Sequence, residues 1–120
     1  MTVKLLLLKS GEDVVADVQE MIVPDGEEKR VFGYYLDVPH RVKLVADVPK
    51  DGTTQHRTRI QMIPWLPLSK DRTIPIPSDW VITIVNPHDE VRDMFNKRLE
   101  EINEAEATST DEQPESVDSD

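Results

Sequence analysis

The sequence predicts a mainly β domain of five or six short antiparallel strands, followed by one amphipathic helix and a disordered acidic tail. Apolar and polar residues alternate along several short segments, and turn-forming residues separate these segments at intervals of about 8–12 residues. The apolar period then lengthens to a helical one after Asn86. Such a series of short strands is typical of a small barrel or sandwich. We therefore expect a β domain over residues 1–86, a helix over 87–106 and a tail over 107–120.

The first two predicted strands form a hairpin. Val3–Lys9 is apolar, Ser10-Gly11-Glu12 has the composition of a tight turn, and Asp13–Ile22 alternates through Val14, Ala16 and Val18. The polar, turn-rich stretch at 24–30 predicts a loop.

Two further strands are predicted before residue 48, with a break between them. Val31–Val38 is aromatic and β-branched, Pro39 interrupts it, and His40–Asp47 resumes the alternation. Tyr34 and Tyr35 are adjacent, so one should face the core and the other should face outward. A turn is expected at 49–54 and another strand over Arg57–Ile63.

Prolines dominate the next part of the chain. Pro64, Pro67, Pro75 and Pro77 lack the amide donor that a central strand needs, so this part should form edges, bends or bulges. A short edge strand is expected at Thr73–Ile76, and Trp80–Val85 is the most strand-like hexamer of the chain.

The predicted helix begins with a capping signal. Asn86 suits the cap and Pro87 the first helical position. The following apolar residues recur three or four apart and form one stripe: Val91, Met94, Phe95, Leu99 and Ile102. Beyond Ala107 the polar composition predicts disorder.

Charge and composition exclude several classes of protein. The formal net charge is −10, yet residues 101–120 hold eight acids and no base, so the body carries only −2. Cysteine is absent, which excludes disulfides, thiolate zinc sites and a cysteine nucleophile. The three histidines are scattered, and we find no catalytic motif. We expect no metal, no cofactor and no enzymatic activity. With no apolar run long enough to span a bilayer, we expect a cytoplasmic protein that does not bind membranes.

Three stretches, which correspond to two motifs, together resemble the Sm/LSm family of small RNA-binding barrels. LLLKSGEDVVADV (6–18) is similar to the family's opening hairpin, and GYYLDVPHRVKL (33–44) to the remainder of its first motif, with Asp37 matching the family's Asp. IPIPSDWVITI (74–84) is similar to the closing motif, although Pro77-Ser78 replaces its Arg-Gly. Ala16 replaces a usual glycine, and the helix follows the strands where the family places it before them. The proline-rich segment at 63–87 also resembles uncharacterised proteins of marine cyanophages and metagenomes, for which the same fold is implied.

The resemblance implies a five- to six-stranded Sm-like barrel that assembles through its last strands. One subunit's edge strand would pair with that of the next, closing a ring of about five to seven subunits. The interface would be formed by Thr73, Ile74, Ile76, Val81, Thr83 and Val85.

The resemblance also implies a nucleic-acid site around the central pore of the ring. RNA or single-stranded DNA would contact two loops, the first containing Asp37, His40, Arg41 and Lys43, and the second containing Ser78, Asp79 and Trp80. Ordinary solvated turns and a core or interface tryptophan are the simpler interpretations. Arg57 and Arg59 lie two apart, forming either a basic strip or a solvated sheet face.

Other interpretations stay open. The protein could be a structural or adaptor ring, encoded by a phage and located in the host cytoplasm, that binds protein instead of nucleic acid. It could also be a monomeric accessory domain. The acidic tail could compete for a basic pore or only increase solubility.

Overall fold

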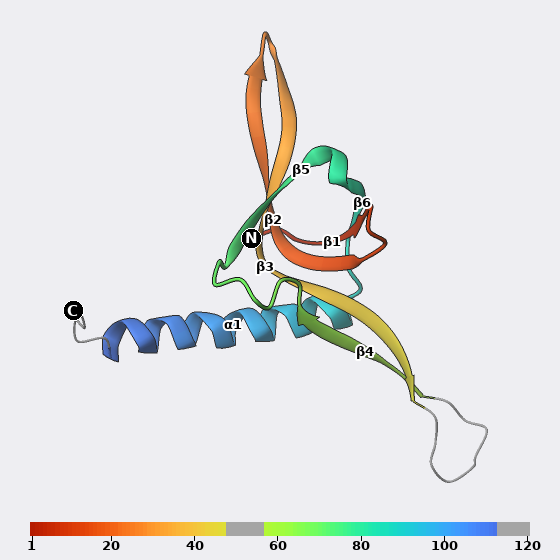
Figure 1. The fold of residues 1–120 in the computed structure, drawn as a ribbon, viewed down its shortest axis with the longest axis vertical. Coiled ribbons are helices and arrows are strands. Elements are labelled where there is room, and N and C mark those ends of the chain that lie inside the picture. The colour runs from red at the N-terminus through yellow and green to blue at the C-terminus, as the bar shows by residue number, and fades with distance from the viewer. Residues whose placement is uncertain (48–56, 113–120) are drawn as a thin grey trace.

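The computed structural model describes residues 1–47 and 57–112 and shows one six-stranded antiparallel sheet with a C-terminal helix (Figure 1). The elements follow in the order β1 (Val3–Leu8), β2 (Asp13–Asp25), β3 (Glu28–Asp47), β4 (Arg57–Pro64), β5 (Thr73–Pro77), a 3₁₀ turn η1 (Ser78–Trp80), β6 (Val81–Val85) and α1 (Asp89–Glu112). The mainly β class, the antiparallel sheet and the C-terminal helix are confirmed.

The sheet is open. Its strands lie in the order β4-β3-β2-β1-β6, and β5 pairs with the first half of β3. The margins formed by β4 and β5 on one side and β6 on the other are not hydrogen-bonded to each other. The strands therefore curve without closing a barrel. Thr73–Pro77 and Val81–Val85 both lie at sheet margins, as the edge-strand prediction requires.

The loop predicted at 24–30 is wrong. β2 and β3 continue pairing to Asp25 and Glu28, so only Gly26 and Glu27 form the turn. Gly26 has a φ of 66°, a conformation that two-residue hairpin turns need and that glycine adopts without a steric penalty. The result is a long two-stranded arm that projects from the body (Figure 1).

The break predicted at Pro39 is also wrong, because β3 is continuous through it. Val38 takes a φ of 53° and bends the strand where it changes partner, from β5 to β4. The Val38 amide donates to the Arg72 carbonyl, and the Pro39 carbonyl accepts from the Trp65 amide. Pro39 is tolerated in this strand because its missing amide lies between the β3–β5 ladder and the β3–β4 ladder.

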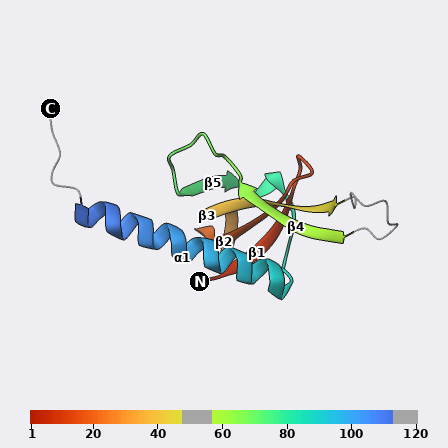
Figure 2. The same cartoon turned by 90° about the horizontal axis from the view of Figure 1, so that it is seen from below.

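Two apolar clusters lie on opposite faces of the sheet. The inner cluster is enclosed by the curved strands and consists of Leu6, Leu8, Val14, Ala16, Leu36 and Ile76. The second cluster lies between the sheet and α1, which runs beneath the strands (Figure 2). It consists of Val15, Val38, Val91, Phe95 and Leu99. The predicted helical stripe therefore does face the sheet through Val91, Phe95 and Leu99, with Ile102 packed at the side of the cluster. Met94 is half-buried and is not part of the cluster.

The helix boundaries differ from the prediction. The helix begins at Asp89, two residues after Pro87, and the His88 carbonyl accepts from the Arg92 amide. It continues to Glu112, so residues 107–112 are helical and not a disordered tail. The alternating Glu and Ala that precede this stretch have high helix propensity, which favours the extension. The rest of the predicted tail and the turn predicted at 49–54 lie outside the described residues.

Candidate functional site

The first set of predicted nucleic-acid residues lies on a strand and not on a loop. Asp37, His40, Arg41 and Lys43 all belong to β3, and the bend at Val38 turns their side chains to different surroundings. The family resemblance implied a pore-lining loop, whereas the residue pattern predicted two strands with a break at Pro39. The structure therefore separates this set into three environments.

His40 is buried and faces the helix. Its side chain is 4% exposed and packs edge-to-face against Phe95, with ring centroids 6.5 Å apart. Nδ1 lies 2.9 Å from the Val38 carbonyl oxygen, so it donates to that oxygen. Burial lowers the pKa of His40, and the nearby Arg98 lowers it further, against the opposing effect of the Val38 bond. A pore-lining role for this side chain does not fit its position.

Asp37 is held by an arginine that the sequence analysis missed. Arg72 donates from Nε to one carboxylate oxygen at 2.9 Å and from Nη2 to the other at 3.1 Å, and the Thr73 hydroxyl donates at 2.9 Å. Arg72 also bonds Asn103 and Glu106 of α1. The hydrogen bonds to Asp37 raise the pKa of Arg72, because the carboxylate stabilises the charged guanidinium that donates to both of its oxygens. The pair ties β3, β5 and α1 together.

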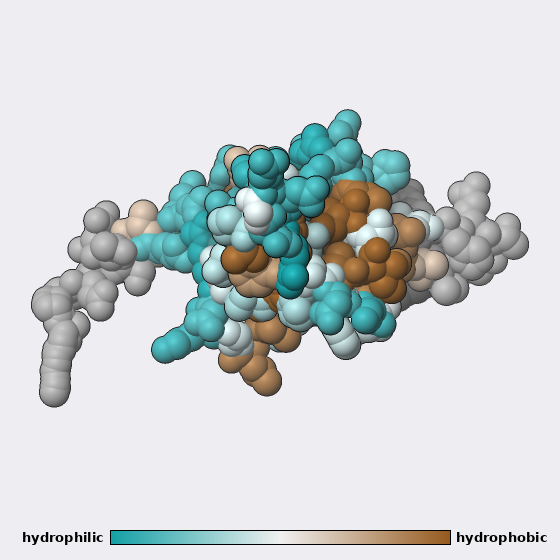
Figure 3. Space-filling view, turned by 90° about the horizontal axis from the view of Figure 1, so that it is seen from above, coloured by the Kyte–Doolittle hydropathy of each residue, from teal (hydrophilic) through white to brown (hydrophobic). Residues whose placement is uncertain are grey.

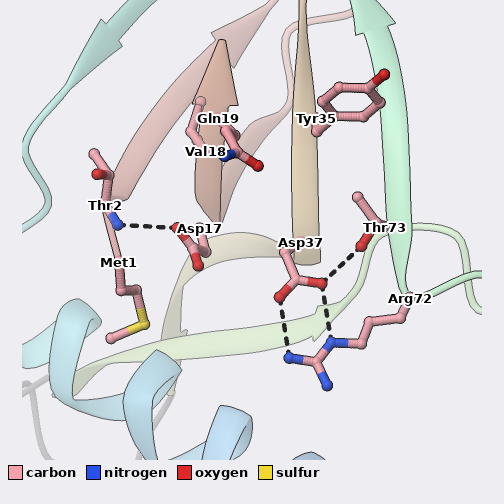
Figure 4. Close-up of a pocket in the computed structure, with 9 residues that line it drawn as sticks. All are labelled: Met1, Thr2, Asp17, Val18, Gln19, Tyr35, Asp37, Arg72 and Thr73. Carbon is pink, nitrogen blue, oxygen red and sulfur yellow. Dashed lines mark hydrogen bonds and ion pairs between the residues drawn. The ribbon is translucent and has the colours of Figure 1, made fainter. Parts of the chain in front are cut away.

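Figure 4 shows the hollow beside this pair, where Asp17 and Asp37 project from adjacent strands. The hollow has a volume of about 490 Å³ and is lined by Met1, Thr2, Asp17, Val18, Gln19, Tyr35, Asp37, Arg72 and Thr73. Asp17 accepts from the Thr2 amide, so both carboxylates already have donors. Within residues 1–47 and 57–112, no group of three acidic, histidine or cysteine side chains could hold a metal.

Three cations share one face of the β3–β4 hairpin, which we call the basic face: Arg41, Lys43 and Arg59. The register pairs Arg41 with Ile63, Lys43 with Gln61 and Arg59 with Val45, so these six side chains alternate with those that face α1. Arg41 is partly neutralised by Glu12, whose carboxylate lies 3.7 Å from its Nε. The side chain of Arg57, which the predicted basic strip also included, lies outside the described residues.

The second predicted set, Ser78, Asp79 and Trp80, forms the 3₁₀ turn before β6. The Trp80 carbonyl accepts from the Lys9 amide, which fixes the turn against the β1–β2 hairpin. The Trp80 side chain is 43% exposed, so it is not a core residue.

The other aromatic predictions have clear outcomes. Tyr34 packs against the inner cluster and Tyr35 faces outward, as alternation requires. Trp65 anchors the β4–β5 loop, since it packs on the inner cluster and its indole N–H donates to Glu12 at 3.2 Å.

Prolines remove donors from the free margin of β5. In an antiparallel ladder, successive residues direct their main-chain groups alternately toward and away from the partner strand. The Ile76 oxygen lies against Gly33 of β3, so Ile74 and Ile76 face β3 while Thr73, Pro75 and Pro77 face outward. The margin therefore offers carbonyls but only the Thr73 amide. The Ile76 side chain is also buried in the core, which leaves little of it for a neighbour.

The β6 margin is apolar and irregular. A register shift leaves Ile82 without a partner on β1, and the bulge lets Val81 and Ile84 both face the inner cluster. Trp80, Ile82 and Val85 have exposed side chains. Figure 3 shows apolar surface gathered on one side of the face seen from above. Of the predicted interface residues on this strand, Thr83 and Val85 are exposed and Val81 is half-buried.

No protein-family model matches the chain, and no curated protein matches its sequence. The described part of α1 contains no stretch that is long and apolar enough for a membrane-spanning helix.

Proposed function

We propose that the protein is an Sm-like module that assembles with copies of itself and binds single-stranded nucleic acid. The observation that carries the proposal is the position of the last strands. β4 and β5 form one margin of an open, curved sheet, and β6 forms the other. Such margins expose unpaired main-chain groups that a second chain can pair with. A head-to-tail contact of this kind closes into a ring, for which we propose about five to seven subunits.

The prolines restrict how the two margins meet. The outer side of β5 has only the Thr73 amide as a donor. The β6 strand of the next subunit therefore obtains most of its main-chain hydrogen bonds from β4. Apolar contacts supply the rest, from Trp80, Ile82 and Val85 on one side and the exposed Leu66 and Leu68 on the other.

The basic face is the proposed nucleic-acid surface. Arg41, Lys43 and Arg59 can pair with phosphates, and the exposed Ile63 offers an apolar contact for a base. One such face is small, and the body carries a net charge of −2. A ring repeats the face in each subunit, which multiplies the number of phosphate contacts.

The test combines particle mass with binding. Light scattering on the intact protein should give a mass several times that of one chain. Fluorescence anisotropy with a labelled adenine-rich or uridine-rich oligonucleotide should then show binding at low salt. Lys43→Ala should weaken this binding several-fold, whereas Lys97→Ala on the exposed side of α1 should not, since it removes the same charge elsewhere. A monomer, or equal effects of the two substitutions, would contradict the proposal.

A second candidate is an adaptor that binds protein. The exposed Trp80, Ile82 and Val85 on the β6 margin favour it, since neighbouring exposed apolar side chains mark interaction surfaces. It requires assembly but no oligonucleotide binding. An assembled particle that leaves the oligonucleotide unbound at micromolar concentrations would support the adaptor over the nucleic-acid binder.

A further inference from the structure

The packing of α1 on the sheet depends on a histidine that must stay uncharged. His40 lies in the middle of β3, between β2 and β4, where its partners in register are Val15 and Pro64. Phe95 of α1 covers the ring from the helix side. Because Nδ1 donates to the Val38 carbonyl, Nε2 is left as a bare acceptor.

Protonation of Nε2 is unfavourable while the helix is packed against the ring. This atom is buried and has no hydrogen-bond partner in the part of the chain that the structure describes. Protonation would turn it into a buried, charged donor without an acceptor, which is strongly unfavourable. The neutral ring is therefore the form that fits beneath the helix.

The surrounding charges do not compensate. Val15 on β2 and Pro64 on β4 are not ionisable. On α1, Arg98 lies nearby and has the same sign as a charged imidazole. The β4–β5 loop contributes Lys70, Asp71 and Arg72 to a hollow of about 290 Å³ that His40 also lines, with Glu106 of α1 at the same hollow. Of these acids, Glu106 is bound to Arg72, and neither it nor Asp71 bonds Nε2.

The helix is the element that can move. β3 is fixed by ladders to β2 on one side and to β4 and β5 on the other. α1 is held by side-chain packing, by the bonds from Arg72 to Asn103 and Glu106, and by the Lys4–Asn86 bond near its start. Because Nε2 is buried in the packed state, hydration of a charged ring requires the packing around it to loosen.

We propose that His40 is an acid-sensitive latch: protonation of Nε2 lifts α1 from the sheet and exposes the apolar face formed by Val15, Val38, Phe95 and Leu99. This proposal is independent of nucleic-acid binding and of assembly. It adds a conformational change that moderate acid triggers while the sheet remains folded.

The direction of the pH effect follows from linkage. Burial places the pKa of His40 below its ordinary value of 6.5 when the helix is packed, whereas the lifted state has the ordinary value. The lifted state therefore binds the proton more tightly, and the packed helix loses stability as pH falls below about 6.5. Above that pH the latch is closed.

Hydrogen exchange measured by mass spectrometry tests the latch on the intact chain. After correction for intrinsic rates, protection across residues 89–108 should fall between pH 7.5 and 5.0, by at most roughly tenfold for each pKa unit by which the packed and lifted states differ. The β1–β2 peptides should change much less. His40→Gln, which cannot titrate, should abolish the pH response, and the control His88→Gln at an exposed position should keep it.

An equal pH response in His40→Gln and wild type would overturn the latch, as would α1 protection that does not change with pH. If His40→Gln does not fold, NMR titration of wild type decides the question. The His40 ring should titrate below 6.5, and its contacts to Phe95 should disappear in the same transition. Titration at the ordinary value with the contacts intact would also refute the proposal.

Discussion

Single side chains link parts of this fold that are distant in sequence. Asp37 and Arg72 are the clearest case, since a fork of two hydrogen bonds joins the bend of β3 to the chain entering β5. The same guanidinium reaches α1 through Asn103 and Glu106. The sequence identified Asp37 as a candidate, but nothing local pairs it with a residue 35 positions later.

Removing the carboxylate should destabilise the protein. Asp37→Ala leaves Arg72 and the Thr73 hydroxyl without a half-buried acceptor, so we expect a loss of about 1–3 kcal/mol in the free energy of unfolding. Urea denaturation at pH 7 measures it. Glu101→Ala is the control, because its pair with Arg98 is exposed and should contribute less than about 0.5 kcal/mol. Equal effects would mean that the Asp37 fork is no more than a surface contact.

Gly33 permits the close approach of β5 to β3. A Cβ at this position would lie 2.7 Å from the Ile76 carbonyl oxygen, which is main chain and cannot rotate away. Gly33→Ala should therefore push β5 outward, at a loss of about 1–3 kcal/mol. Hydrogen exchange should rise in β5 more than in β1. Unchanged β5 protection would show that the two strands can separate slightly while keeping their bonds.

At the scale of elements, the margin of β5 shows how proline blocks edge pairing. Pro75 and Pro77 occupy the outward positions of a five-residue strand, so the exposed side offers acceptors almost without donors. The strand is protected against indiscriminate pairing while its inner side completes a regular ladder with β3. The prolines in the sequence predicted an edge strand correctly, but their orientation depends on the register with Gly33 and Tyr34.

Restoring the donors should promote association. Pro75→Val with Pro77→Val adds two outward amides to the β5 margin, and we expect a larger particle or aggregation at lower protein concentration. Sedimentation velocity over a concentration series measures this. Pro67→Val is the matched control, since it makes the same substitution in the β4–β5 loop and away from a strand. No difference between the two would mean that β5 takes no part in contacts between chains.

At the scale of the whole molecule, local patterns predicted the elements better than the site. Alternation at Val14, Ala16 and Val18 and the helical stripe around Phe95 are properties of neighbouring residues, and both were confirmed. The burial of His40 was not predictable in the same way, because it depends on Phe95, which is far along the sequence. The continuous β3 was missed because the bend at Val38 is stabilised by distant main-chain groups of Arg72 and Trp65.

The charge distribution of the whole molecule predicts how nucleic-acid binding should depend on salt. The net charge of −10 opposes long-range attraction, so affinity has to come from local ion pairs between the basic face and phosphates. Each cation that neutralises a phosphate of a single strand contributes a slope of about −0.7 to log K against log salt. Lys43→Ala and Arg59→Ala should therefore each make the slope shallower by about that amount, and Lys97→Ala should leave it unchanged.

Anisotropy titrations at four salt concentrations give these slopes. Lines that coincide for wild type and both basic-face variants, in slope and in affinity, would place the phosphates on another surface. The reason is that a cation paired with a phosphate displaces a condensed counterion from the strand, so a variant without that cation must release fewer counterions on binding. A change in affinity without a change in slope would therefore show that Lys43 and Arg59 act on binding through the shape of the surface and not through their charge.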